Sequence, residues 1–261
     1  MRWPSISVVT CSYNQARFLD AAMRSVLEQR YPRLEYIVID GASTDGSVDV
    51  IRRYANELAY WASEPDGGQT DALIKGFARA TGDIQCWMNS DDLLEPGSLH
   101  EVARFFETHP QARVVYGDAT WIDANGRPLK RKREHGFSRF VWMYDHNYIP
   151  QPSTFWRRDL YEEVGGLDPR FDYSMDADLW IRFAQVTAMY HTNRVWSRER
   201  IYPEQKNQRW RTRCDAEDLL IRRRYLGDER PWSRRAKALV AKGMRVTWKM
   251  ALGSYRPPRE G

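Results

Sequence analysis

Apolar and polar positions alternate in a regular way along the N-terminal third of the chain. Short runs rich in Val and Ile predict buried strands, and segments with apolar residues three to four apart predict helices between them. The strands are expected at residues 5–10, 34–39, 60–63 and 84–88, and the helices between Asn14 and Tyr31, at 45–58 and at 70–80. Strands that alternate with helices in this way predict a parallel, doubly wound α/β sheet.

Beyond Asp92 the pattern becomes mixed. Helices are expected at 96–108, 158–164 and 175–185, and strands at 113–116, 119–122 and 151–156. The chain therefore divides into an α/β region over residues 1–210, with halves at 1–95 and 96–210, and a helical extension over residues 211–261.

Four polar clusters fall where the predicted strands of the first half end. They cover residues 10–14, 40–45, 66–69 and 89–92, and three of them contain carboxylates. Ligands of open α/β sheets bind at the carboxyl ends of the strands. The clusters therefore predict a site for a polar ligand, together with a cation.

Asp91 and Asp92 follow the fourth predicted strand directly. Adjacent carboxylates suit Mg²⁺ or Mn²⁺, which take oxygen ligands and complete their shell with waters and substrate phosphates. A solvated, helix-capping loop is the alternative for such a pair, and the position at a strand end favours the cation.

Asp40 ends the second predicted strand and is followed by small residues up to Gly46. A carboxylate there can accept hydrogen bonds from a nucleobase or a ribose hydroxyl, while small residues let the backbone turn sharply. The alternative is an ordinary strand-to-helix turn with Asp45 as the helix cap.

Several motifs, in their order and spacing, resemble family 2 of the inverting glycosyltransferases, which have the GT-A fold: a Rossmann-like nucleotide-binding sheet flanked by helices. The motifs are VVTCSYN at 8–14, VIDGASTDG at 38–46, SDD at 90–92, QPST at 151–154, VGGLD at 164–168 and MDADLW at 175–180. They span about residues 5 to 185, and their combination is far more specific than any one of them.

The resemblance implies a nucleotide-sugar donor and assigns residues to it. Thr10, Tyr13 and Asn14 would line the nucleotide pocket, Asp40 would contact the base, most typically uracil, and Asp66 and Lys75 would lie near the ribose or diphosphate. Asp91 and Asp92 would form the DxD-type motif, with Asp92 as the more direct ligand of Mn²⁺ or Mg²⁺. Residues 1–95 would then bind the donor, and residues 96–210 the acceptor.

For the acceptor side, the resemblance implies that Asp176 is the general base. Asp176 and Asp178 lie two apart on a predicted helix, so they point in different directions and only one is expected to face the acceptor. Asp176 also fits a carboxylate stabilised by the helix dipole, and both interpretations can hold together. Gln151, Asp178 and Trp180 would lie near the acceptor, although Trp180 fits a core residue equally well.

One motif departs from the processive members of the family. Residues 206–210 read KNQRW, in which Lys206 replaces the Gln of a Gln-x-x-Arg-Trp motif. A single-addition transferase, active in cell-surface polysaccharide or glycan synthesis, is the expectation. Its acceptor would be a saccharide or a lipid-linked saccharide.

A dehydrogenase is disfavoured because no GxGxxG follows the first strand. A non-catalytic protein that binds nucleotide sugars or carbohydrates on the same fold remains the alternative.

The charge distribution and the cysteine content limit which partners the protein is expected to bind and in which cell compartment it is expected to work. The net charge of +5 is concentrated in the excess of Arg and Lys between Arg222 and Lys249. A basic end beside an acidic site argues against a nucleic-acid binder, which needs a basic stripe over its working face. Three cysteines, no signal-like start and no long apolar run predict a cytoplasmic protein, at most peripheral at the inner face of the cell membrane.

The C-terminal extension is predicted to contain a basic amphipathic helix. Apolar and small residues share one side of it, and basic residues recur every seven positions on another. The first set is Trp232, Ala236, Leu239, Val240, Gly243 and Thr247, and the second is Arg235, Lys242 and Lys249. Such a helix can lie on an anionic membrane or pack on the catalytic domain, and the sequence leaves both open.

Overall fold

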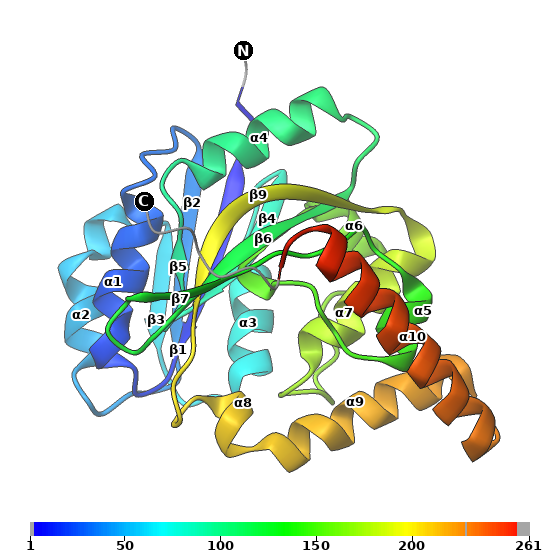
Figure 1. Ribbon diagram of the computed structural model, residues 1–261. Coiled ribbons are helices and arrows are strands. Elements are labelled where there is room, and N and C mark those ends of the chain that lie inside the picture. Colours follow the sequence, from blue (N-terminus) through cyan, green and yellow to red (C-terminus); the bar gives the residue numbers. More distant parts are fainter. Residues whose placement is uncertain (1–2, 228, 255–261) are drawn as a thin grey trace.

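The computed structural model describes residues 3–227 and 229–254, which form a mixed sheet flanked by helices (Figure 1). Nine strands of the described chain join in the order β3-β2-β1-β4-β8-β6-β9-β5, with β7 paired to β6. The strands are β1 (Ile6–Ser12), β2 (Leu34–Asp40), β3 (Tyr60–Ser63), β4 (Ile84–Asn89), β5 (Leu93–Leu94), β6 (Val114–Ile122), β7 (Pro128–Lys132), β8 (Thr154–Arg157) and β9 (Met189–Arg200). The fold is α/β, as the sequence predicts.

The N-terminal half is the parallel part of the sheet. β1 pairs in parallel with both β2 and β4, and β2 pairs in parallel with β3. Helices α1 (Ala16–Leu27), α2 (Ser47–Arg53) and α3 (Gln69–Phe77) connect these strands. α3 packs very closely on β1, since a Cβ at Gly76 would lie 2.4 Å from the Val9 side chain. The four strands and their connecting helices confirm the predicted parallel arrangement of this half.

The second half differs in detail from the prediction. The two strands expected at 113–116 and 119–122 form one strand, β6, and the expected strand at 151–156 is the short helix η2 (Gln151–Ser153) followed by β8. β8 runs antiparallel to β4 and β6, whereas β9 runs parallel to β6. β9 was not predicted, because polar and charged residues occupy most of it.

Helices cover this second half. They are α4 (Ser98–Thr108), α5 (Arg139–Tyr144), α6 (Arg158–Glu163), α7 (Met175–Val186), α8 (Lys206–Arg209), α9 (Arg211–Leu226) and α10 (Pro231–Ala251). α9 contacts α7, and α10 contacts α5 (Figure 1). Within the predicted extension at 211–261, α9 and α10 are helices; residues 228 and 255–261 lie outside the described part. Among the described residues, no helix is both long and apolar enough to cross a membrane.

Candidate active site

A cavity of about 770 Å³ opens at the carboxyl ends of β1 and β4. Its size lies within the range of roughly 300–1,000 Å³ that is typical of ligand sites. The end of β1, the loop before α3, the end of β4, the start of α7 and the segment around α8 supply its walls. The predicted site residues among its lining are Tyr13, Asp66, Asp91, Gln151 and Asp176. Residues far apart in the sequence therefore meet in one cavity, at the sheet edge that the strand pattern indicated.

The two adjacent carboxylates after β4 are both buried. Asp91 lines the cavity, and its Oδ2 accepts a hydrogen bond from the Tyr202 hydroxyl at 2.9 Å. Asp92 lies behind it: Oδ1 accepts from the backbone N–H of Arg200 at 2.9 Å, and Oδ2 accepts from the Asn89 amide at 3.1 Å. Burial raises the pKa of Asp91, and burial together with the neighbouring Asp91 raises that of Asp92 well above its usual range. Burial therefore makes two uncompensated negative charges unfavourable at this site, and a bound cation would offset that free energy cost.

Amide side chains link the acidic loop to both flanks of the cavity. The Gln69 amide donates to Asn89 Oδ1 at 2.9 Å, and the Asn89 amide donates to Gln151 Oε1 at 3.1 Å as well as to Asp92. The Gln151 amide in turn donates to the Trp87 carbonyl at 2.8 Å. This chain of hydrogen bonds fixes Gln151 at the cavity wall.

Asp176 lies in the first turn of α7 and lines the cavity. Its Oδ2 accepts a hydrogen bond from the Asn147 amide at 2.8 Å. Burial raises the pKa of Asp176 to about 6, with a further rise from Asp218, while the Asn147 hydrogen bond acts in the opposite direction. A carboxylate with such a pKa is ionised at neutral pH and can still take up a proton, which suits a general base.

Helix α9 holds the loop that leads into α7. The Glu217 carboxylate accepts backbone N–H bonds from Asp172, Tyr173 and Ser174 at 2.8–3.1 Å. α9 therefore positions the helix that carries Asp176, although the sequence assigned α9 to a C-terminal extension.

The segment around α8 contributes residues that the sequence-based assignment did not include. Lys206 lines the cavity, where its ammonium group pairs with the Asp172 carboxylate at 2.7 Å and donates to Gln69 Oε1 at 3.2 Å. Arg209 and Trp210 line the same cavity. The KNQRW motif at 206–210 is the signal in the sequence that indicates these residues.

Four residues expected at the donor lie outside the cavity lining. Asn14 bridges to the next loop by accepting from the Thr44 N–H, and Lys75 pairs with Glu64 and Asp71. The buried Thr10 hydroxyl is hydrogen-bonded to Tyr36, and the buried Asp40 carboxylate accepts from Ser43 and Ser63. In this structure Thr10 and Asp40 therefore have structural partners within the protein, and the flanking Cys11 and Gly41 face the cavity instead.

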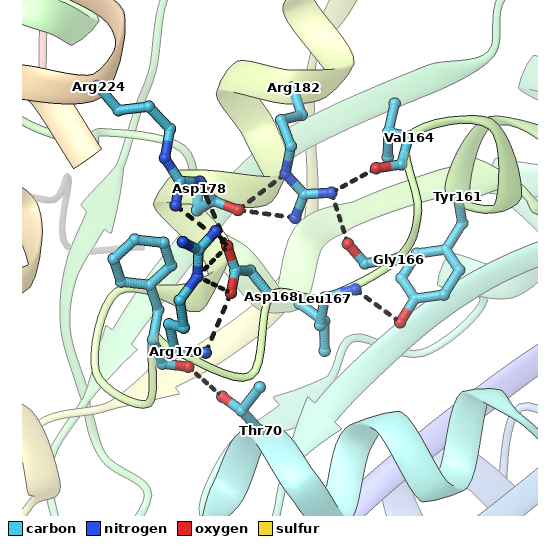
Figure 2. A network of polar contacts seen from close by, with 11 residues as sticks. Thr70, Tyr161, Val164, Gly166, Leu167, Asp168, Arg170, Asp178, Arg182 and Arg224 are labelled. Atoms are coloured by element: carbon cyan, nitrogen blue, oxygen red, sulfur yellow. Dashed lines mark hydrogen bonds and ion pairs between the residues drawn. The ribbon is translucent and has the colours of Figure 1, made fainter. Parts of the chain in front are cut away.

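Asp178, expected near the acceptor, is buried and belongs instead to an ion-pair network (Figure 2). Its carboxylate pairs with Arg182 at 2.7 Å and with Arg224 of α9 at 3.0 Å. Arg224 also reaches Asp168. The network ties α9 to α7, and it places Asp178 away from the cavity that Asp176 lines. The prediction that only one of the two carboxylates faces the site thus agrees with the geometry.

Trp180 is fully buried and does not line the cavity. Its ring stacks on Trp87 with centroids 5.6 Å apart and contacts Trp156 at 5.7 Å. Of the two interpretations of Trp180, the structure supports the core residue and not the acceptor contact.

Trp180→Ala is therefore expected to lower the free energy of unfolding by about 3–5 kcal/mol, as for other large aromatic residues removed from a core. Urea unfolding measures this loss. The control is Trp232→Ala, whose side chain is 67% exposed and whose loss should cost less than about 0.5 kcal/mol. If Trp180→Ala instead left the free energy of unfolding unchanged and weakened acceptor binding, Trp180 would be an acceptor contact.

Known proteins similar to this chain include glycosyltransferases. Residues 7–165 match the family model described as glycosyl transferase family 2. An uncharacterized glycosyltransferase of Mycobacterium tuberculosis strain H37Rv is 33% identical over 187 residues, which cover 70% of each chain. The O-antigen biosynthesis protein RfbC of Myxococcus xanthus is 30% identical over 196 residues, which cover 72% of this chain and 15% of RfbC.

Solved structures share the fold. The mannosyltransferase PcManGT of Pyrobaculum calidifontis, in complex with GDP-Man and Mn²⁺, aligns with a TM-score of 0.68 and 22% identity over 93% of this chain and 70% of that chain. S. aureus TarS in complex with UDP-GlcNAc aligns with a TM-score of 0.64 and 18% identity, over 79% of this chain and 61% of that chain.

The mixed sheet, with a polar cavity at its strand ends, has the fold of these GT-A structures, and the family match and the curated relatives identify the chain as a glycosyltransferase. Because the family model matches more than half of its length, the chain belongs to glycosyl transferase family 2.

Proposed function

We propose that this glycosyltransferase moves a sugar from a nucleoside diphosphate sugar, preferably a UDP-sugar, to a saccharide or lipid-linked acceptor. The transfer inverts the anomeric centre, adds one sugar at a time and serves cell-surface polysaccharide or glycan synthesis. The enzyme works in the cytoplasm and contacts the inner face of the cell membrane through its C-terminal extension. The observation that carries the proposed reaction is the meeting of Asp91 and Asp176 in one cavity.

The donor occupies the side of the cavity formed by the ends of β1 and β4. Tyr13 offers an aromatic face that is 64% exposed, and Asp66 and Asp91 offer carboxylates to ribose hydroxyls. Lys206 and Arg209 are the cationic side chains among the described lining residues, so they complement the diphosphate. The roles expected for Thr10, Asn14, Asp40 and Lys75 remain predictions that would require their side chains to move toward the donor.

The residues present fit a divalent cation. Two adjacent carboxylates with raised pKa values, one of them on the cavity wall, are the donor set that Mg²⁺ or Mn²⁺ takes when waters and phosphates complete the shell. No group of three or more potential ligands occurs among the described residues, so the protein would supply few ligands. Asp91 and Asp92 would hold the cation, which would neutralise charge on the departing diphosphate.

Asp176 serves as the general base on the acceptor side. The acceptor hydroxyl loses its proton as it attacks the anomeric carbon from the face opposite the diphosphate, and the Asp176 carboxylate takes that proton. Asn147 orients the carboxylate by donating a hydrogen bond to Oδ2. Gln151, fixed by its hydrogen bonds to Asn89 and Trp87, lines the acceptor side.

A non-catalytic protein that binds nucleotide sugars is the competing function. Such a protein does not need a carboxylate that takes up a proton in its cavity, whereas a transferase does. Asp176 therefore favours the enzyme.

A thermal-shift panel tests the donor site. UDP, GDP, dTDP and CMP are each added with and without Mn²⁺, and a ligand at a hundredfold excess over its dissociation constant stabilises the fold by about 2.7 kcal/mol. We expect UDP to raise the melting temperature, and to do so more strongly with Mn²⁺. A larger shift with GDP or dTDP would indicate a GDP-sugar or a dTDP-sugar as the donor. No shift with any nucleotide would contradict the proposal.

A further inference from the structure

One face of α10 exposes apolar side chains to solvent. Trp232, Leu239, Val240 and Met250 are 67%, 73%, 56% and 64% exposed. They lie on the same side of the helix, which we call the outer face: Trp232, Ala236, Leu239, Val240, Gly243, Thr247 and Met250, all exposed. This is the side whose apolar pattern the sequence could explain either by a membrane or by packing on the domain.

Packing on the domain uses the opposite side of the helix. Ala241 is buried, and Met244 and Trp248 pack against the core. Three ion pairs fix the orientation: Lys237 with Glu229 at 2.6 Å, Lys249 with Glu134 at 2.9 Å, and Arg245 with Asp145. α10 lies beside α5 at the edge of the molecule (Figure 1). Because rotation of the helix would break these pairs, its outer face stays exposed.

The charges of α10 point to the partner. The helix contains six Lys and Arg residues and no Asp or Glu. Three of the six cations serve the inner ion pairs, whereas Arg235 and Lys242 are exposed at the rim of the outer face and form no ion pair within the described chain. An apolar face with a Trp at one end and a basic rim without acidic residues is suited to the interface of an anionic bilayer.

We propose that the outer face of α10 docks on an anionic membrane, with the helix axis parallel to the bilayer plane. The apolar side chains enter the boundary between headgroups and acyl chains, and Arg235 and Lys242 contact the lipid phosphates. The inference deepens the proposed function: a lipid-linked saccharide becomes the acceptor class, since the docked enzyme meets acceptors held in the same membrane.

Co-sedimentation with vesicles tests the docking. Wild-type protein is expected to bind vesicles of phosphatidylcholine with one third phosphatidylglycerol, and to bind pure phosphatidylcholine far less. Leu239→Glu combined with Met250→Glu should weaken binding to the anionic vesicles at least about tenfold, because charges would enter the apolar boundary. Arg235→Gln and Lys242→Gln should each weaken it about fivefold. Leu220→Glu is the matched control, since Leu220 is 57% exposed on α9, and it should bind like wild type.

Equal binding by wild type and the outer-face variants would overturn the proposal, as would no binding by wild type. Light scattering adds a third outcome: a wild-type dimer that Leu239→Glu converts to a monomer, without vesicle binding, would make the outer face a contact between copies of this chain and also overturn it. The nucleotide-induced melting shift, measured on the same variants, reports on the donor site. Loss of vesicle binding with the shift retained therefore leaves the proposed transferase function intact.

Discussion

Asp176→Asn is expected to reduce sugar transfer about a thousandfold while donor binding is retained. Asparagine keeps the shape of the side chain and can still accept the hydrogen bond from Asn147, but it cannot take up a proton. Transfer rate and nucleotide affinity, measured on the same preparation, separate the two effects. Asp215→Asn is the control, because Asp215 is an exposed carboxylate of α9 whose loss should leave transfer unchanged.

The pH dependence of the wild type gives the same prediction a second readout. Burial raises the pKa of Asp176 to about 6, so kcat/KM should fall as the pH is lowered through 6 and the base becomes protonated. The residual activity of Asp176→Asn should lack this limb. The variant should also melt at or above the wild-type temperature at pH 8, because it no longer holds a charge that burial disfavours. Transfer near the wild-type rate in Asp176→Asn would remove Asp176 as the base.

Asp91→Asn and Asp92→Asn are each expected to weaken metal-dependent donor binding by at least about tenfold. Asp91→Asn can retain the hydrogen bond from the Tyr202 hydroxyl, because an amide oxygen can accept it. Asp92→Asn can retain the bond from the Arg200 N–H but loses the one from the Asn89 amide, since its own NH₂ group only donates. Each replacement removes a negative charge, and the loss of that charge weakens the binding of a cation. Nucleotide titrations with and without Mn²⁺ measure the loss as a reduced difference between the two affinities.

Glu204→Gln is the matched control for the cation site, because Glu204 is another carboxylate that lines the cavity. Its response to Mn²⁺ should match that of wild type. A lost response in Glu204→Gln, with Asp91→Asn and Asp92→Asn unaffected, would move the cation away from the end of β4.

The parallel half of the fold could be predicted because three of its strands, β1, β2 and β4, are short apolar runs that are almost wholly buried. β9 could not, because its twelve residues are mostly polar, and its place in the sheet comes from pairing along β6. α9 has almost no apolar stripe, and it is held by Glu217 and Arg224 instead. Contacts of this kind join residues distant in sequence, so periodicity does not reveal them.

In the site, too, sequence motifs predict part of the arrangement, and contacts between distant residues determine the rest. Motifs locate the loops that meet at the sheet edge, and Tyr13, Asp66, Asp91, Gln151 and Asp176 line the cavity there. They do not determine which side chain of a loop faces inward.

Neighbouring residues can therefore differ in role within one motif. Successive strand residues point to opposite faces, so Cys11 lines the cavity while the Thr10 hydroxyl meets Tyr36. On α7, Asp178 is buried and pairs with Arg182 of the same helix and Arg224 of α9, whereas the neighbouring Asp176 lines the cavity.

Slow hydrolysis of the donor tests the central claim most directly, because water can replace an acceptor that is not yet identified. Wild-type protein, the nucleotide sugar that matches the best nucleotide of the melting panel, and Mn²⁺ are incubated together, and released nucleoside diphosphate is quantified over hours. We predict release by wild type, and its loss in Asp176→Asn at unchanged donor affinity. A donor that binds tightly and stays intact with wild type would contradict the account and favour a protein that only binds nucleotide sugars.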